Sequence, residues 1–391
     1  MKVAIFSDTY PPEINGVATS TRNLYRTLKA HGEEVIVIAT NPFDSEFSYV
    51  DDIMRVPGFV MKKLYGYIAP NPWNEKCTRL VEEFKPDVIH VQTDGMIGQM
   101  GFMLASRLKS ALVYTFHTMI EDYTYYANKG HFDRAFKSVV RSYIRYKANE
   151  VNEFITPSEK IREYMRSINV DSYISVIPTG IDFDLFDRKS MDIEKTKALK
   201  EKIGLKENEL VILSLGRVAK EKSIDVCIRG YSLFLKNNPS IKTKMLVVGG
   251  GPAMNELKEL TKKCGIEESV LFIGPVHPDA TPLYYSLGDC VVSASVSETQ
   301  GLTFMEAMAS DNILFARYDD TLSGLIHEKE NGFFFFDEMD MAKKLNHIVN
   351  LSEIEKKTIF EHAHRSIEPY SLERFYSSIV EVYHRAIKKN Y

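Results

Sequence analysis

The chain has 391 residues, 44% of them hydrophobic, and a formal net charge of −4 at pH 7. The charge of the whole molecule therefore points neither to a nucleic-acid-binding protein nor to a disordered chain. The length predicts two domains, because single hydrophobic cores stop growing at about 250–300 residues.

Short β-branched runs alternate with helical patterns from the first residue onward. An amphipathic helix is predicted at Ala18–His31, with Gly32 as its C-terminal cap. The buried parallel strands predicted around it are Lys2–Phe6, Glu34–Ala39, Val88–Gln92 and Ala111–Phe116. This order predicts a doubly wound sheet.

The same alternation restarts in the second half of the chain. Its predicted strands are Glu209–Leu215, Lys244–Val248, Val270–Ile273, Cys290–Ala294 and Ile313–Ala316. A last amphipathic helix is predicted at Leu372–Lys388. We expect an α/β protein with two Rossmann-like domains, 1–185 and 186–369, facing a cleft, and a C-terminal helix, 370–391, that packs back on the first domain.

The segment from Ser295 to Ala309 combines two carboxylates with a glycine. Glu298 and Glu306 are eight residues apart and flank Gly301. Gly301 allows close approach of the backbone to a ligand, and the N–H groups of the helix that follows can hold a phosphate. The first carboxylate can then accept hydrogen bonds from a sugar, and the second those of a ribose. The alternative is that both are ordinary charges on a helix surface.

A second charged group follows the strand that is predicted to end at Leu215. Gly216 is followed by Arg217 and, five residues later, by Lys222. Arginine can bind a phosphate through its planar fork, and lysine can meet a neighbouring phosphate as a point charge. The pair predicts a site for a nucleoside diphosphate, stabilised as a leaving group without a metal.

Together these segments resemble the family-4 class of retaining glycosyltransferases, which have the GT-B fold. The matching motifs follow the family's order over nearly the whole chain. They are Ser7–Val17, Phe116-His117-Thr118, Ile177–Asp182, Gly216-Arg217 with Lys222, Gly249–Pro252, and Glu298 with Glu306.

The resemblance implies a role for each matching residue. The residues to which it assigns the donor diphosphate are Gly16, Arg217 and Lys222. His117 and Glu298 would contact the donor sugar and Glu306 the ribose, with backbone contacts from Gly301, Leu302 and Thr303. In such enzymes the departing phosphate deprotonates the acceptor, so the resemblance implies neither a separate general base nor a cofactor or metal. Asp182-Phe183-Asp184 spells a metal-binding DxD, but we interpret it as part of the interdomain connection.

Two features depart from simple motif matches. The segment Ser310–Ile313 replaces the family's small-Gly-x-Pro turn, so we expect a local change there without loss of activity. The run Gly249–Gly251 invites a dinucleotide-binding interpretation. The third glycine of that fingerprint is Met254 here, so a tight strand-to-helix turn is favoured and a dehydrogenase is not.

A finer resemblance concerns the acceptor. The aromatic segment from Phe116 to Tyr126 is similar to that of family-4 enzymes that glucosylate diacylglycerol on bacterial membranes. A basic helix is predicted directly downstream, and helices of this kind can lie on an anionic leaflet. A solvated charged face is the alternative. The basic residues expected at the membrane are Lys129, Arg134, Lys137, Arg141, Arg145 and Lys147.

Cysteine usage and hydropathy bear on the location. The four cysteines lie far apart and form no CxxC pair, which favours reduced thiols. No segment approaches the roughly 18 uninterrupted apolar residues of a membrane span, and the run after Met1 is too short for a signal peptide. We expect a cytoplasmic protein, peripheral on the inner face of the cell membrane.

The sequence therefore predicts transfer of a hexose, most simply glucose from UDP-glucose, to a membrane lipid such as 1,2-diacylglycerol. One alternative is a transferase of the same class that acts on a soluble or wall-polymer acceptor. A non-catalytic GT-B binding protein and a nucleotide-sugar epimerase are alternatives from other classes. The sequence does not determine the base, the sugar, the oligomeric state, or whether a first or a second sugar is added.

Overall fold

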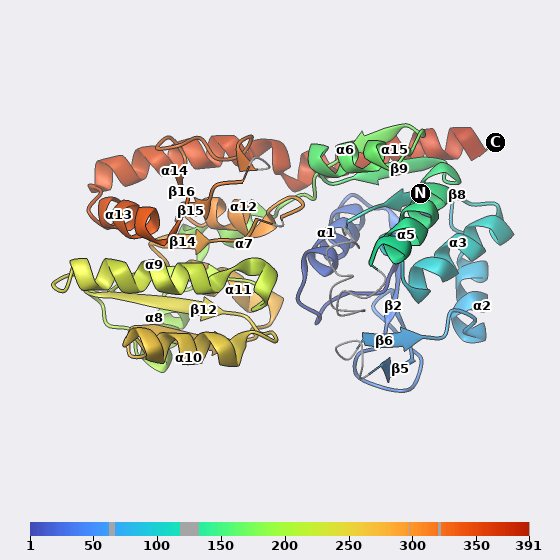
Figure 1. The fold of residues 1–391 in the computed structure, drawn as a ribbon. Helices are drawn as coiled ribbons and strands as arrows, with labels where there is room; N and C mark the ends of the chain where they lie inside the picture. Colours follow the sequence, from blue (N-terminus) through green and yellow to red (C-terminus); the bar gives the residue numbers. More distant parts are fainter. Residues whose placement is uncertain (62–66, 118–132, 297, 320–321, 391) are drawn as a thin grey trace. The chain divides into compact units, whose positions relative to one another are not determined.

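The structure, a computed structural model, describes residues 1–61, 67–117, 133–296, 298–319 and 322–390. The chain forms two compact units (Figure 1). Unit 1 comprises Met1–Gly180 together with Leu372–Tyr391, and unit 2 comprises Ile181–Ser371. The C-terminal segment thus belongs to the same unit as the N-terminal half of the chain.

Unit 1 is built on an eight-stranded sheet with the strand order β10-β9-β8-β7-β1-β2-β4-β3, in which only the β3–β4 pair is antiparallel. A separate antiparallel hairpin consists of β5 and β6. The strands are β1 Lys2–Ser7, β2 Glu34–Thr40, β3 Ser48–Val50, β4 Ile53–Val56, β5 Gly58–Met61, β6 Tyr67–Pro70, β7 Val88–Val91, β8 Ala111–Thr115, β9 Glu153–Thr156 and β10 Ile174–Val176.

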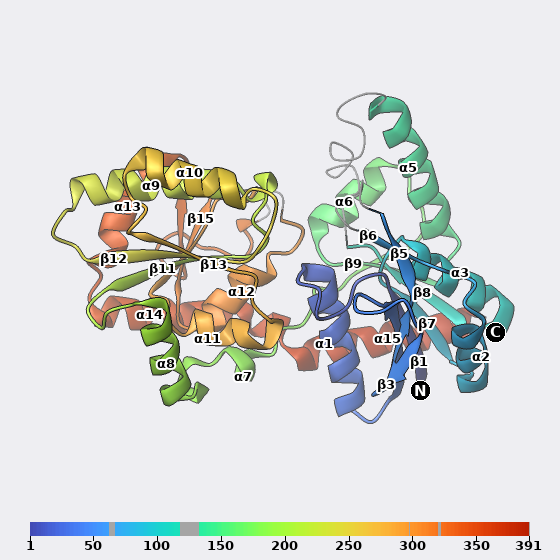
Figure 2. The ribbon, with the colours of Figure 1, turned by 90° about the horizontal axis from the view of Figure 1, so that it is seen from below.

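Helices cover both faces of this sheet because alternate strand residues point to opposite sides. Val3 and Ile5 pack with α1 and α15, whereas Ala4 and Phe6 pack with the helices of the other face (Figure 2). The first pair of helices is α1 Gly16–Ala30 and α15 Leu372–Asn390. The others are α2 Glu75–Phe84, α3 Met96–Leu108, α5 Asp133–Asn149 and α6 Glu159–Ser167.

Unit 2 contains a six-stranded, wholly parallel sheet with the order β13-β12-β11-β14-β15-β16. Numbered within the unit, this is the order 3-2-1-4-5-6 of a doubly wound dinucleotide-type sheet. The strands are β11 Leu210–Leu215, β12 Thr243–Val248, β13 Val270–Gly274, β14 Cys290–Ser293, β15 Ile313–Arg317 and β16 Phe333–Phe335.

Two buried cores flank this second sheet, and strand residues again alternate between them. The helices of one core are α9 Ile224–Asn237, α10 Met254–Cys264 and α13 Glu338–Val349. Those of the other are α7 Phe183–Phe186, α8 Ile193–Ile203, α11 Thr281–Tyr285 and α12 Leu302–Ala309. Helix α14, Glu353–Ile367, contributes residues to both cores.

The structure confirms the predicted α/β class with parallel sheets, and each predicted strand is present with ends that differ by at most one residue. The prediction omitted the short strands β3 to β6, β9, β10 and β16. These carry too few residues for a periodic signal. Among the described residues, no helix is long and apolar enough to cross a membrane.

Candidate active site

The charged residues of unit 2 gather where its strand order reverses direction. Strand β11 lies between β12 and β14, so the chain winds one way from β11 and the other way from β14. The loop after β11 carries Arg217 and Lys222, and the loop after β14 carries Glu298. Ligands of doubly wound sheets bind outside the carboxyl ends of strands at such a switch point.

Glycines hold the loop after β11 in place. The Gly216 N–H donates to the carbonyl of Val248 at 3.0 Å, and the Val218 N–H donates to that of Gly250 at 2.9 Å. A Cβ at Gly249 would lie 1.8 Å from the Gly216 carbonyl oxygen, so only glycine permits this approach. The glycine run is thus the predicted tight turn from β12 to α10, and it supports the loop that carries Arg217.

Lys222 and Glu298 form an ion pair across the switch point. The lysine Nζ lies 2.6 Å from Oε1 of Glu298, and both side chains are partly buried. Arg217 makes a longer contact, 3.7 Å from its Nη1 to Oε1 of Glu221. The structure therefore brings Lys222 and Glu298 into contact and places Arg217 on the same loop as Lys222. A phosphate that approached Lys222 would compete with Glu298 for it.

Glu306 lies on α12, the helix that begins after Gly301. Gly301 has a φ of 81° in the left-handed region and, lacking a side chain, provides no side-chain cap for the helix. Leu302 and Thr303 form the first turn of α12, as predicted from the sequence. The amides of such an uncapped first turn are suited to an anion.

Tyr285, whose hydroxyl contacts Glu306, was not predicted from the sequence. Its hydroxyl lies 2.9 Å from Oε2 of Glu306 and 3.2 Å from the Thr303 carbonyl oxygen. Burial, together with the nearby Glu306 carboxylate, raises the pKa of Tyr285 well above its usual value, so the phenol stays protonated and donates. Tyr285 ends the short helix α11 within an apolar run, and no sequence signal separated it from a core tyrosine.

The segment that departs from the family pattern is a closed turn. Asp311, which stands at the family's glycine position, has a φ of 52°, in the left-handed region that aspartate tolerates. Its carboxylate lies 3.0 Å from Nε2 of His364. Asn312 is buried and donates to the Tyr285 carbonyl at 3.0 Å. The unusual turn therefore helps to fix the residue that holds Glu306.

In unit 1 the strand order reverses between β1 and β7. Asp8, just after β1, accepts hydrogen bonds from the N–H groups of Ile97 and Gly98 at the start of α3, at 3.0 and 3.3 Å. Gly16 is exposed and is the first residue of α1, where Asn15 provides the cap. Asp8 thus lies on the loop between β1 and α1, and Gly16 lies where that loop ends and α1 begins.

His117 follows β8 and is held by a residue that sequence analysis missed. Its Nε2 lies 2.7 Å from Oε1 of Gln92, the residue after β7. Burial lowers the pKa of His117 to about 4, so the imidazole is neutral near pH 7. Gln92 itself lies 2.9 Å from Nε2 of His90. Polar residues at alternate positions in an otherwise apolar strand were the signal available for this pair.

A carboxyl group with a perturbed pKa lies next to these residues. Asp94 accepts a hydrogen bond from the Tyr114 hydroxyl, and burial raises the pKa of Asp94 to about 6. Asp8 adds to this increase, whereas Lys147 opposes it. The switch point of unit 1 is therefore built largely from neutral or protonatable groups, in contrast to the paired charges of unit 2.

The predicted membrane-binding residues lie on and before α5. Lys129 lies outside the described residues, and so does the side chain of Arg134. Arg141 and Arg145 are exposed, and Lys137 is partly exposed. The exposed surface of α5 also includes Val139, at 68%, and Tyr146, at 60%. Ile144 and Ala148 form the buried face of α5.

Lys147 differs from the other basic residues of α5. Its ammonium lies 4.1 Å from the centre of the Phe102 ring and 5.8 Å from that of Tyr143. Burial lowers the pKa of Lys147, and Asp94 partly offsets this effect. Lys147 is thus a packed cation within unit 1. The aromatic segment Tyr123–Tyr126 lies outside the described residues.

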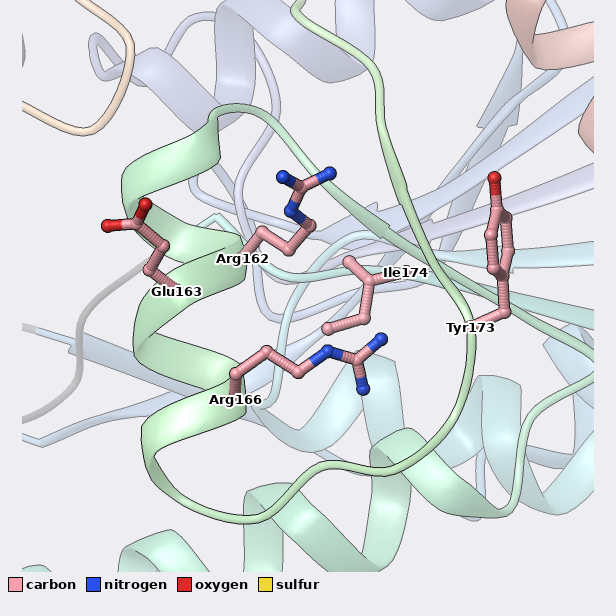
Figure 3. Close-up of a pocket in the computed structure, with 5 residues that line it drawn as sticks. All are labelled: Arg162, Glu163, Arg166, Tyr173 and Ile174. Atoms are coloured by element: carbon pink, nitrogen blue, oxygen red, sulfur yellow. The ribbon is translucent and has the colours of Figure 1, made fainter.

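A pocket of about 490 Å³ lies on unit 1 between α6 and β10 (Figure 3). Its lining consists of Arg162, Glu163, Arg166, Tyr173 and Ile174. None of the predicted site residues takes part in it. Asp182, the first residue of the DxD sequence, accepts from the Leu185 N–H at 3.3 Å and so caps α7.

Two family models match the chain in succession. Residues 14–185 match Glycosyltransferase Family 4, and residues 195–365 match Glycosyl transferases group 1. These ranges include every residue that the sequence resemblance assigns to the donor.

Two curated relatives are similar over the full chain. An alpha-monoglucosyldiacylglycerol synthase of Streptococcus pneumoniae is 34% identical, over 100% of this chain and 87% of the relative. An alpha-monoglucosyldiacylglycerol synthase of Acholeplasma laidlawii is 32% identical, over 100% of this chain and 98% of the relative.

Solved structures share the fold at lower identity. Sucrose-phosphate synthase from Thermosynechococcus elongatus matches with a TM-score of 0.78 at 18% identity, over 98% of each chain. Anabaena HepE in complex with UDP-glucose matches with a TM-score of 0.73 at 16% identity, over 97% of this chain and 98% of that one.

Proposed function

This chain belongs to glycosyltransferase family 4, and from that membership we propose that it transfers glucose from UDP-glucose to 1,2-diacylglycerol, with retention of the anomeric configuration. The observation that carries the proposal is the full-length similarity to two synthases named for this glucolipid. The switch point of unit 2 supports the donor half of the proposal, because it gathers the cations and carboxylates that a nucleotide sugar requires.

The donor diphosphate would bind at Arg217 and Lys222. Lys222 would exchange the Glu298 carboxylate, now 2.6 Å away, for a phosphate oxygen. After this exchange, the Glu298 carboxylate would accept hydrogen bonds from the sugar hydroxyls. The amides of Leu302 and Thr303 would add dipolar stabilisation at the start of α12.

Glu306 would accept the two ribose hydroxyls, and Tyr285 would keep it in position. The reaction then needs little else from the protein. The bond between the sugar C1 and the diphosphate oxygen breaks, the acceptor oxygen bonds to C1 on the same face, and the acceptor proton passes to the departing phosphate. The two cations stabilise the charge that develops on that phosphate, so the proposed reaction uses no metal.

The lipid acceptor requires contact with the membrane, and α5 supports this part of the proposal. Arg141 and Arg145 project two positive charges, and Val139 and Tyr146 expose apolar surface beside them. A basic residue near an anionic leaflet gains about 1 kcal/mol, and apolar side chains add by burial in the headgroup region. We place α5 on the inner face of the cell membrane.

A second exposed apolar group in unit 1 also favours contact with a membrane. Phe59 and Val60 on β5 are exposed, and Trp73, the only tryptophan of the chain, is 71% exposed. The N–H of Asn71, two residues before Trp73, donates to the Pro57 carbonyl at 3.3 Å, which ties the two segments together. Aromatic side chains with a polar edge favour the membrane–water interface.

The decisive experiment incubates the purified protein with UDP-glucose and diacylglycerol in mixed micelles that contain anionic lipid. Mass spectrometry of the lipid extract should detect monohexosyl diacylglycerol, and NMR of the anomeric proton should assign an α linkage. A Lys222→Ala variant serves as the control for the donor site. If the protein binds UDP but no glycolipid forms, diacylglycerol is not the acceptor. A β-linked product would contradict retention.

A further inference from the structure

A chain of buried polar side chains leads from the C-terminal helix to His117. The hydroxyl of Tyr383, on α15, lies 2.7 Å from Nδ1 of His90. Nε2 of His90 lies 2.9 Å from Nε2 of Gln92, and Oε1 of Gln92 lies 2.7 Å from Nε2 of His117. All of these residues belong to unit 1. We call Tyr383, His90, Gln92 and His117 the relay.

The chemistry of the amide fixes the direction of each hydrogen bond. An amide nitrogen only donates, so Nε2 of His90 must offer a lone pair to Gln92. A neutral His90 then carries its proton on Nδ1 and donates it to Tyr383. An amide oxygen only accepts, so Nε2 of His117 carries a proton and Nδ1 is the ring nitrogen with a lone pair.

The surroundings of His90 and His117 keep both imidazole rings neutral and hold them in place. His90 and Tyr383 are completely buried, and their rings meet edge to face at 5.5 Å. The Thr115 hydroxyl also lies 2.7 Å from Nε2 of His90. Burial lowers the pKa of His90 to about 3, and the neighbouring His117 contributes to this shift. Each bond of the relay therefore constrains the next.

We infer that Tyr383, His90 and Gln92 are positioning residues that fix His117 in the Nε2–H tautomer, so that His117 accepts a hydrogen bond from a donor-sugar hydroxyl through Nδ1. The inference rests on the proposed role of His117 at the donor sugar. It assigns the C-terminal helix a part in the reaction, since Tyr383 is the last member of the relay. A packing role for α15 alone would not require a tyrosine hydroxyl on a buried histidine.

The test combines variants with NMR of histidine ring nitrogens in protein labelled with ¹⁵N-histidine. The wild type should show the proton on Nε2 of His117 and on Nδ1 of His90. Gln92→Glu keeps an acceptor for His117 but has no donor for His90, so His117 should be unchanged and His90 should become protonated on Nε2. Gln92→Leu and Tyr383→Phe should both change the His117 signal. A proton on Nδ1 of wild-type His117 would overturn the inference.

Donor kinetics provide the functional measurement. Tyr383→Phe should lower kcat/KM for UDP-glucose roughly three- to tenfold, as expected for one weakened hydrogen bond. Tyr376→Phe is the matched control, because Tyr376 lies on the same helix but its hydroxyl donates to Glu33 at 3.2 Å, outside the relay. Equal effects of the two variants would show that the loss arises from the packing of α15, and this result would overturn the inference.

The two proposals can fail separately. The ring tautomers are observed without any acceptor, so the expected pattern would support the relay even if diacylglycerol proved not to be the acceptor. Conversely, formation of the glucolipid by a protein whose His117 carries its proton on Nδ1 would overturn the relay and leave the proposed reaction intact.

Discussion

The two units place polar residues at the same point of their sheets, but the chemistry of these residues differs. Both are built on mainly parallel sheets whose strand order reverses next to the first strand, and both place polar residues at that reversal. In unit 2 these residues are charged and paired, as in the contact between Lys222 and Glu298. In unit 1 the contact between His117 and Gln92 joins two buried, neutral side chains instead.

The difference follows from what each unit is proposed to bind. A diphosphate carries concentrated negative charge, and only cations that give up another partner can meet it without a large desolvation cost. A sugar hydroxyl or a lipid alcohol is neutral, and oriented neutral donors and acceptors select it without attracting stray ions. Fold alone does not fix the chemistry of a switch point, which depends on the side chains placed there.

The largest expected effect comes from the charged pair of unit 2. Lys222→Ala removes a cation from the proposed diphosphate site and breaks its ion pair with the partly buried Glu298. Loss of a charge-assisted contact of this kind costs about 3–4 kcal/mol, which corresponds to a fall of about 10²- to 10³-fold in kcat/KM. Steady-state kinetics with varied UDP-glucose measure it.

The double variant Lys222→Ala/Glu298→Gln sharpens this test. If part of the loss arises because the Glu298 carboxylate has lost its lysine, the second substitution should recover some donor binding, and the two effects should not be additive. Full additivity would mean that the pair is incidental and that Lys222 acts on the donor alone.

The neutral character of unit 1 predicts an unusual pH dependence for Asp94. Its pKa is raised to about 6, so the folded protein holds a proton that the unfolded chain releases near pH 4. Stability should therefore fall as the pH rises between these values and remain lower above pH 6. Asp94→Asn, which can still accept from Tyr114, should raise the unfolding free energy at pH 7.5 by up to about 3 kcal/mol.

Asp8→Asn is the contrasting variant for this measurement. Asp8 accepts two backbone N–H bonds at the start of α3, so loss of its charge should lower stability. Denaturant unfolding at pH 5 and pH 7.5 distinguishes the two. An Asp94→Asn variant that is less stable than the wild type at pH 7.5 would show that the carboxylate is stabilised and that this part of unit 1 relies on charge.

The same contrast explains what could be predicted from the sequence. The main strands were predictable because each is a run of apolar residues. The charged loops of unit 2 were predictable because Arg217, Lys222 and Glu298 lie close to glycines in the sequence. The buried residues His90, Gln92 and Tyr383 were not identified, because a polar residue inside a strand or helix has no spacing rule that reveals its partner. Tyr383 lies 293 positions from His90, and only the tertiary structure joins them.

The exposed charges of α5 are a third environment, and they test whether unit 1 uses charge outside its switch point. Arg141→Gln/Arg145→Gln should weaken binding to anionic vesicles by about 2 kcal/mol, or about 30-fold, at low salt, and by less at high salt. Vesicle sedimentation measures the binding. Lys197→Gln/Lys202→Gln, an equal change of charge on α8 of unit 2, is the control. Equal losses from both pairs would point to net charge rather than to α5.

Tyr285 is an exception to the difference between the two units, because in unit 2 this buried, neutral phenol donates a hydrogen bond to the Glu306 carboxylate. Tyr285→Phe keeps the ring between α11 and α12 but removes the donor 2.9 Å from Glu306. A hydrogen bond to a charged group contributes about 1.5 kcal/mol, so UDP affinity should fall about tenfold. Titration calorimetry measures it, with Tyr284→Phe as the neighbouring control. If Tyr285→Phe lowers stability but leaves UDP affinity unchanged, Glu306 does not depend on the phenol for its position. If UDP affinity falls while stability is unchanged, the position of the Glu306 carboxylate depends on the buried, neutral phenol of Tyr285.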